Sequence, residues 1–386
     1  MLSSRKRVLT ALRHREPDRV PFDMGGTHVT GISLGAYHRL RARLDLPPRE
    51  ACWADVIQQV VVPDEDMLDR LEVDTRGLFP LCSHNWNVHE QLEDGGANWT
   101  YRDEWGITHS FPKENGLWFT IVSEPLRDAP PECAAVEGHA WPEAGDFRRV
   151  EGLRALAEKH RANDKIVILK GLCAGLFEMS QRIRGMQNAL MDPLLYPDMA
   201  DRLYGTLADL KIAFFETALQ ELGDVVDIVV ETDDYGTQES QLISPEQYRA
   251  TLKAHQTRLF AAIKRAAPHV FLFFHSCGNV RPLLPDFIEA GVDILNPVHV
   301  RAAGMEPRGL KRDFGDAITF WGGGVDTQHT LPCGTPQDVK DDVKRNLDAL
   351  APGGGYVFST VHNIQSEVQP ENILAMWEAL REHGIY

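Results

Sequence analysis

The sequence predicts an α/β fold, a single (β/α)₈ TIM barrel that occupies residues 1–386 as one domain. Short apolar, β-branched runs alternate with segments of helical periodicity, which is typical of parallel strands joined by helices. Eight such runs occur, which favours closure into a barrel. The runner-up, a doubly wound open sheet, is disfavoured because no G-x-G-x-x-G turn follows the first run.

The expected strands follow one another along the whole chain. They are residues 19–24, 71–77, 165–171, 226–234, 270–277, 292–298, 317–324 and 355–362. Among the helical segments between them, 244–267 and 335–351 have the clearest periodicity. The second of these begins with Thr335 as N-cap and Pro336 at the first helical position, which is a strong start signal.

Other parts of the chain lie outside this repeat. The N-terminal residues have an amphipathic helical pattern, and residues 25–65 are expected to add helices that cover the entrance or the base of the barrel. Residues 84–125 alternate aromatic and polar side chains, which predicts a β-hairpin insertion after the second strand. We expect its aromatic side chains to pack on the barrel, with a substrate lid as the alternative.

The composition excludes several classes of protein. The chain has 40 Lys and Arg residues against 56 Asp and Glu, a formal charge of −16, so no nucleic-acid surface is expected. We find neither a signal peptide nor an apolar run of about 18 residues, and therefore expect a cytoplasmic protein that does not enter a membrane. Its six dispersed cysteines favour reduced or metal-bound thiols over a disulfide framework.

Polar residues stand at the carboxyl side of nearly every expected strand. They are Asp23, Asp74, Arg76, Asp233, Asp234, His275, Cys277, Asn296, Asp326 and His362. In barrels the reacting groups lie at this end of the strands and in the loops that follow. The sequence therefore predicts a site that combines residues from many strands.

A metal site is expected around His275 and Cys277. Side chains two apart on a strand share a face, so both can point to one spot, and imidazole and thiolate are ligands that suit zinc. The alternative is a packed histidine beside a small buried cysteine. His362 is the expected third ligand, with Cys333 as its competitor, and the fourth ligand is open. His362 could instead act as an acid, a base or a hydrogen-bond donor.

The remaining strand-end residues have several possible roles. Asp234 is expected to be catalytic: it could complete the metal shell, hold a general base or bind a cationic group, and a simple turn is the alternative. Asp74 and Arg76 are also expected in the catalytic site, where the arginine could grip a substrate carboxylate, or they form a plain ion pair. The expected substrate-binding residues are Asp23, Asn296 and Asp326.

Several longer stretches resemble the uroporphyrinogen decarboxylase superfamily. They are HSCGNVRPLLPDFIEAGVDILNPV, TFWGGGVDTQHTLPCGTPQDV, GGGYVFSTVHNIQSEVQPENILAMWEAL, ALRHREPDRVPFDM and IRGMQNALMDPLLYPDMADRL. The resemblance implies a (β/α)₈ barrel and a homodimer. True decarboxylases of this superfamily hold substrate carboxylates with an arginine-rich segment after the first strand. Residues 23–28 have no arginine, so porphyrinogen decarboxylation is not expected, although Asp74 resembles the substrate-facing aspartate of the family.

The zinc-dependent, corrinoid-linked methyltransferases are the branch that the chain resembles more closely. They carry H-x-C on the fifth strand, matched by His275 and Cys277, and a third thiolate near the last strand, where this chain has His362. An imidazole in place of a thiolate makes the site less electron-rich and raises its Lewis acidity.

The resemblance implies methyl transfer between a corrinoid (cobalamin-type) cofactor and a thiol or a small methylated substrate such as a methyl ether. The replacement by His362 favours the demethylase direction, and the corrinoid is expected on a separate carrier protein. One alternative is a metal-dependent decarboxylase or lyase, in which Arg76 holds a small carboxylate and Asp234 or His362 moves the proton. Another is a ligand-binding barrel with a vestigial site.

Overall fold

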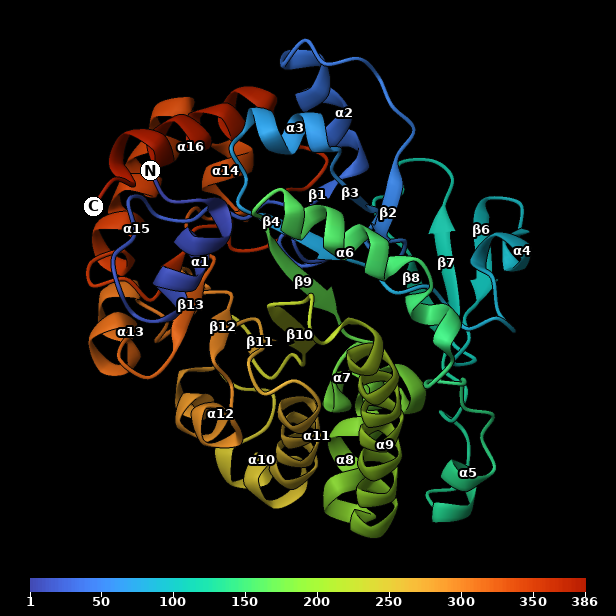
Figure 1. Ribbon diagram of the computed structural model, residues 1–386. Coiled ribbons are helices and arrows are strands. Elements are labelled where there is room, and N and C mark those ends of the chain that lie inside the picture. The colour runs from blue at the N-terminus through green and yellow to red at the C-terminus, as the bar shows by residue number, and fades with distance from the viewer.

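A curled, seven-stranded parallel sheet forms the centre of the molecule (Figure 1). This computed structural model describes residues 1–386, apart from the side chain of His89. The strands, in their order across the sheet, are β14 (Tyr356–Val357), β13 (Thr319–Trp321), β12 (Ile294–Asn296), β11 (Phe271–His275), β10 (Ile228–Thr232), β9 (Ile166–Lys170) and β4 (Thr75–Leu78). Each overlaps one of the expected strands, which confirms an α/β fold of the TIM-barrel type.

The first expected strand, residues 19–24, joins the two edges of this sheet. Its residue Phe22 forms a parallel bridge with Phe358, just beyond β14, and Asp23 N donates to Phe358 O over 2.9 Å. On the other side, Asp74 N donates to Phe22 O over 2.9 Å, just before β4. Pro21 lacks an N–H donor, so this segment forms single bridges rather than a full ladder.

The inside of the sheet is a separate apolar core. Side chains alternate along each strand, and one set points inward. This inner set comprises Ile166, Ile168, Ile228, Val230, Phe273, Ile294, Trp321 and Val357. Helix α1 (Ser4–Leu12) adds Val8, Ala11 and Leu12 to the same cluster and so closes the amino end of the sheet. The interior is therefore packed with side chains rather than open as a pore.

The other helices cover the outside of the sheet (Figure 1). They are α6 (Leu153–Ala162), α7 (Leu176–Arg184), α8 (Met186–Leu195), α9 (Pro197–Leu222), α10 (Pro245–Thr251), α11 (Lys253–Ala266), α12 (Leu284–Ala290), α13 (Pro307–Phe314), α14 (Thr330–Cys333), α15 (Pro336–Leu350) and α16 (Pro370–His383). Thr335 makes the expected N-cap of α15, within a capping box with Asp338. None of the helices among the described residues combines the length and apolarity needed to cross a membrane.

Residues 25–65 differ from the expected helices. They hold only α2 (Leu34–Arg43) and the start of α3 (Glu65–Arg70), beside a small antiparallel sheet of β1 (Ile32–Ser33), β2 (Cys52–Asp55) and β3 (Val60–Val62). The run Val60–Val62 is β-branched and pairs as the middle strand of this sheet. The helices were expected from the pattern of the whole segment, and strands of two to four residues are too short to show in such a pattern.

The insertion after β4 is a four-stranded antiparallel sheet rather than one hairpin. After α4 (Val88–Gln91) it runs through β5 (Glu93–Asp94), β6 (Asn98–Arg102), β7 (Thr108–Pro112) and β8 (Thr120–Ser123), and α5 (Cys133–Glu137) follows. Tyr101 and Phe119 are buried and pack edge to face, with ring centroids 5.0 Å apart. This contact fits the packing role expected for the aromatic side chains.

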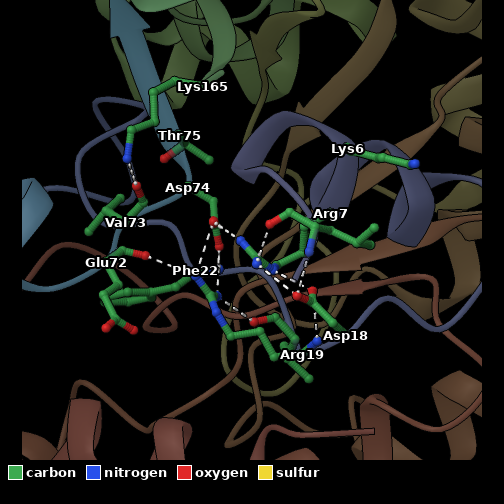
Figure 2. Close-up of polar contacts among 12 residues, drawn as sticks. Lys6, Arg7, Asp18, Arg19, Phe22, Glu72, Val73, Asp74, Thr75 and Lys165 are labelled. Atoms are coloured by element: carbon green, nitrogen blue, oxygen red, sulfur yellow. Dashed lines mark hydrogen bonds and ion pairs between the residues drawn. The ribbon is translucent and has the colours of Figure 1, made fainter. Parts of the chain in front are cut away.

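The amino end of the barrel contains a network of paired charges (Figure 2). Arg7 Nη1 and Arg19 Nη1 donate to the two oxygens of Asp74 over 2.7 and 2.8 Å, and Phe22 N donates to the same carboxylate over 2.9 Å. Because β4 begins at Thr75, Asp74 precedes the strand rather than closing it. The expected position of Asp74 at the carboxyl end is therefore wrong.

Arg76 does not point into the barrel either. Its side chain points outward, where its guanidinium donates to Glu65 over 2.8 Å and to Asp69 over 2.9 Å. Thr75 and Arg76 point to opposite faces because they are neighbours on one strand, and Thr75 takes the inner face beside Asp23. Asp74 and Arg76 thus form separate ion pairs, and not the single pair across the mouth that was considered from the sequence.

Candidate metal centre

His275, Cys277 and His362 meet at the carboxyl end of the sheet. One donor atom from each lies within 4.8 Å of the other two, and Cys277 Sγ is 3.4 Å from His275 Nε2. The rings of His275 and His362 are 5.4 Å apart at 70° to each other. Cys333, the competing third ligand in the sequence, lies exposed at the end of α14 and is not a member of this group.

Strand β11 directs two of these side chains to the same point. Phe273 belongs to the inner core, so His275, two residues later, also points inward at the strand end. Cys277 follows two residues further, and Gly278 then turns the chain at φ +81°. A Cβ on Gly278 would lie 2.5 Å from the Gly236 backbone, so only glycine fits this turn.

Asn296 fixes the orientation of His275. The Asn296 amide Nδ2 donates to the Trp321 carbonyl over 2.9 Å, which leaves its Oδ1 as the acceptor facing His275 Nδ1 at 2.6 Å. His275 therefore carries its proton on Nδ1 and presents the lone pair of Nε2 toward Cys277. Asn296 was expected to bind substrate, and in the structure its amide contacts His275 and the Trp321 carbonyl.

Asp234 lies at the rim of the group, with its side chain 41% exposed. Its Oδ1 accepts the backbone N–H of Cys277 over 2.8 Å and lies 3.7 Å from His275 Nε2. Desolvation raises the pKa of the Cys277 thiol well above its usual value, and the negative charges of Asp234 and Glu178 raise it further. A thiolate at Cys277 therefore requires a cation beside it.

His362 comes from the segment that follows β14. Desolvation lowers its pKa to about 3, and the nearby His275 and His299 contribute to the shift. The ring is therefore neutral near pH 7, with a lone pair available to a metal. The neighbouring Asn363 does not orient this ring. It accepts from Gly31 N over 2.7 Å and donates to His28 O over 2.9 Å, which holds the loop of residues 25–31 in place.

Two residues missed in the sequence lie beside the group. Desolvation and the positive charge of Lys170 lower the pKa of His28 well below its usual value, and His275 and His362 contribute less. His28 Nδ1 is buried without a hydrogen-bond partner among the described residues. Lys170 closes β9 as Asn296 closes β12, so the strand-end signal was present for the lysine. No periodic pattern marks His28, which lies in a loop.

Two further expected site residues are occupied by structural hydrogen bonds. Asp23 is buried and accepts from Thr75 Oγ1 over 2.6 Å and from Trp321 Nε1 over 2.9 Å. Asp326 accepts the backbone N–H groups of three successive residues over 3.0 to 3.2 Å, from Gln328, His329 and Thr330. Both carboxylates therefore hold the ends of strands and loops together.

A second group of possible ligands lies on the surface. His84, Glu143 and Asp146 also have donor atoms within 4.8 Å of one another, but His84 and Glu143 are exposed and Asp146 already caps a short helical turn at Phe147–Val150. A cleft of about 520 Å³ between Trp86, Arg102 and Trp141 lies near this surface group and does not include the metal centre. We assign no role to the surface group.

The donor set and its spacing fit a zinc ion. A tetrahedral zinc with one sulfur and two nitrogen ligands needs donor atoms about 3.5 Å apart. The distance of 3.4 Å between Cys277 Sγ and His275 Nε2 meets this requirement, and His362 lies within reach. Three protein ligands leave one position open, which is the arrangement of catalytic rather than structural zinc sites.

Comparisons with known proteins agree with this fold. A family model described as "Uroporphyrinogen decarboxylase (URO-D)" matches residues 123–383. Among solved structures, a methyltransferase from Methanosarcina mazei is 17% identical, covers 99% of both chains and has a TM-score of 0.62. A xylanase 10B from Thermotoga maritima is 12% identical, covers 60% of this chain and 80% of its own, and has a TM-score of 0.36, too low to carry an argument. No curated protein matches the sequence.

Proposed function

Because this chain belongs to the uroporphyrinogen decarboxylase (URO-D) family, we propose that it is a zinc-dependent methyltransferase that moves a methyl group between a small substrate and a corrinoid. The observation that carries the proposal is the group of His275, Cys277 and His362 at the carboxyl end of the barrel. The full-length likeness in fold to a protein titled methyltransferase supports it.

The residues of the chain would hold the metal and leave room for the substrate. His275 Nε2, Cys277 Sγ and a nitrogen of His362 supply three ligands, and the fourth position is left for a substrate heteroatom. Asn296 keeps the Nε2 lone pair of His275 directed at this point. When bound, the zinc supplies a Lewis acid that polarises a methyl-bearing oxygen or lowers the pKa of a thiol.

The ligand set favours one direction of methyl transfer. Two imidazoles and one thiolate form a harder, less electron-rich site than one imidazole and two thiolates. We therefore favour demethylation of a methyl ether or a similar donor over methylation of a thiol. Asp234, 3.7 Å from His275 Nε2, is the proposed group for holding a proton at the rim. A corrinoid on a separate carrier protein and a homodimer complete the proposal.

Metal analysis tests the first part of the proposal. The purified protein should contain about one zinc per chain, and H275A and C277A should each lose it, because two ligands cannot hold a catalytic zinc tightly. C333A is the matched control, since Cys333 is exposed and outside the group. A protein that stays folded and binds zinc equally well after H275A and C277A would refute the site.

A spectroscopic assay tests the second part. Reduced cobalamin is mixed with the zinc-loaded protein and candidate methyl ethers, and formation of methylcobalamin is followed by absorbance. Conversion that disappears in C277A and persists in C333A supports methyl transfer. Release of carbon dioxide from a small carboxylate, without any corrinoid, would replace the proposal with a metal-dependent decarboxylase or lyase.

A further inference from the structure

Lys170 points into the barrel beside the metal centre. In the parallel register, Lys170 pairs with Val230, and Val230 pairs with Phe273 on the next strand. Val230 and Phe273 belong to the inner core, so Lys170 shares their face. His275 lies two residues beyond Phe273, and the strand spacings put its Cα about 12 Å from that of Lys170. Lys170 and His275 are the last residues of β9 and β11, and only β10 separates these two strands in the sheet.

Lys170 makes no hydrogen bond or ion pair with any of the described residues, although it is only partly exposed. The ammonium groups of the other lysines that are not exposed each donate to a side-chain or backbone oxygen in the described structure: Lys165, Lys211, Lys253, Lys264, Lys311 and Lys340. A half-buried ammonium without a counter-charge costs free energy, so this position is unfavourable for stability alone.

Acidic residues of β10, of α7 and of the insertion are already bonded to other cations. Glu231 is next to Val230 on β10, but it points to the outer face, where Lys211 Nζ donates to it over 2.8 Å. Glu104 and Glu178 pair with the guanidinium groups of Arg149 and Arg182. Lys170 is therefore a positive charge that no protein carboxylate neutralises at the mouth.

We propose that Lys170 binds a negatively charged group of the substrate, a carboxylate or another oxyanion, while the heteroatom of the same substrate faces His275, Cys277 and His362. The role of the metal centre in this proposal rests on the proposed function. His28 is close to both, since Lys170, His275 and His362 all act on it electrostatically. Its unpartnered Nδ1 gives the substrate a further hydrogen-bonding atom. The substrate class is thus a small anionic molecule.

Three thiols with the same two-carbon stem test this charge preference. They are 3-mercaptopropionate, 2-mercaptoethanol and cysteamine, which share one stem and end in a negative, a neutral and a positive group. Calorimetric titration into the zinc-loaded protein should give binding of 3-mercaptopropionate about tenfold or more tighter than that of the other two, because a charge-assisted hydrogen bond is worth that much.

Two substitutions at Lys170 and one control complete the test. K170M should abolish the preference for the negative thiol, and K170R should retain part of it. K344M removes the same charge from the exposed face of α15 and should keep the full preference. Equal binding of the three thiols by the natural protein, or a preference that survives K170M, would overturn the inference.

The same titration without metal separates this inference from the proposed function. If the protein binds no zinc, the proposed function fails, and 3-mercaptopropionate and cysteamine are compared on the metal-free protein. A preference for the negative thiol that K170M removes would still support Lys170 as the anion site. If zinc is bound and cobalamin is methylated but no charge preference exists, only the inference about Lys170 fails.

Discussion

The two ends of the barrel use polar side chains in opposite ways. At the amino end, the carboxylate of Asp74 is fully buried and accepts hydrogen bonds from Arg7, Arg19 and the Phe22 backbone (Figure 2). At the carboxyl end, Lys170 has no partner among the described residues, and neither has the buried Nδ1 of His28. Saturated polar groups indicate stability, and unsaturated ones indicate a place for a ligand.

Electrostatics follow the same division. At the amino end, burial opposes the ionised form of Asp18, but the charge and hydrogen bond of Arg7 and the backbone N–H groups of Leu2 and Arg19 together outweigh it, and the pKa of Asp18 falls to about 2. At the carboxyl end, desolvation is not compensated in this way, and it raises the pKa of the Cys277 thiol well above its usual value. Paired cations thus favour the ionised carboxylate of Asp18 at the amino end, whereas burial favours the neutral thiol of Cys277 at the carboxyl end.

The largest expected effect is at the amino end. D74A leaves Arg7 and Arg19 without their buried counter-charge and should lower the free energy of unfolding by about 3–5 kcal/mol. Urea denaturation measures this loss, while zinc per folded chain should stay constant. D209A, which removes an exposed carboxylate paired with Arg258, should change stability by less than about 1 kcal/mol. Loss of zinc from folded D74A would contradict the division into a stabilising amino end and a ligand-binding carboxyl end of the barrel.

A substitution of Asn296 is expected to have an effect of intermediate size, at the carboxyl end of the barrel. N296A leaves His275 without its orienting acceptor and should weaken zinc binding about 10–100-fold, as measured by competition with a chelator. N372A is the matched control, because this buried amide donates to the backbone carbonyls of Leu331 and Gly334. It should cost stability without changing zinc affinity. Equal zinc affinities in the two variants would contradict the role assigned to Asn296.

Substitution of Asp326 is expected to have the smallest effect, and it tests whether every polar residue at the carboxyl end serves a ligand. It lies at the carboxyl end, yet its acceptor capacity is used by three backbone N–H groups. D326A should therefore lower the free energy of unfolding by about 1–2 kcal/mol and leave zinc and thiol binding unchanged. Weaker thiol binding at unchanged stability would instead support the substrate-binding role that the sequence suggested.

The sequence predicts the strands of the barrel well because their signal is local. Continuous apolar runs mark β9, β10 and β11, and the alternation of side-chain direction along a strand brings His275 and Cys277 to one side. The short strands of residues 25–65 were not predicted, because strands of two to four residues form through tertiary contacts and leave no periodic pattern in the sequence.

The assignment of polar residues to functions was less successful. Asp74 and Arg76 resemble strand-end residues, but a shift of the strand start to Thr75 moves Asp74 to the amino end. No pattern in the chain tells which acid an arginine more than 50 residues away will bind, and Arg7 and Arg19 satisfy Asp74 in this way. The lysine at the end of β9 carried the strand-end signal, but its lack of a partner became visible only in three dimensions.

The packing of α1 against the inner core affects how ligands can reach the candidate metal site. Because Val8, Ala11 and Leu12 fill the amino end of the inner core, no ligand can reach His275 and Cys277 through the barrel from that end. Under the proposed function, the small substrate and the carrier protein would then both approach from the carboxyl end, where each can block access for the other. Kinetics that depend on the order in which the two are added would be the consequence.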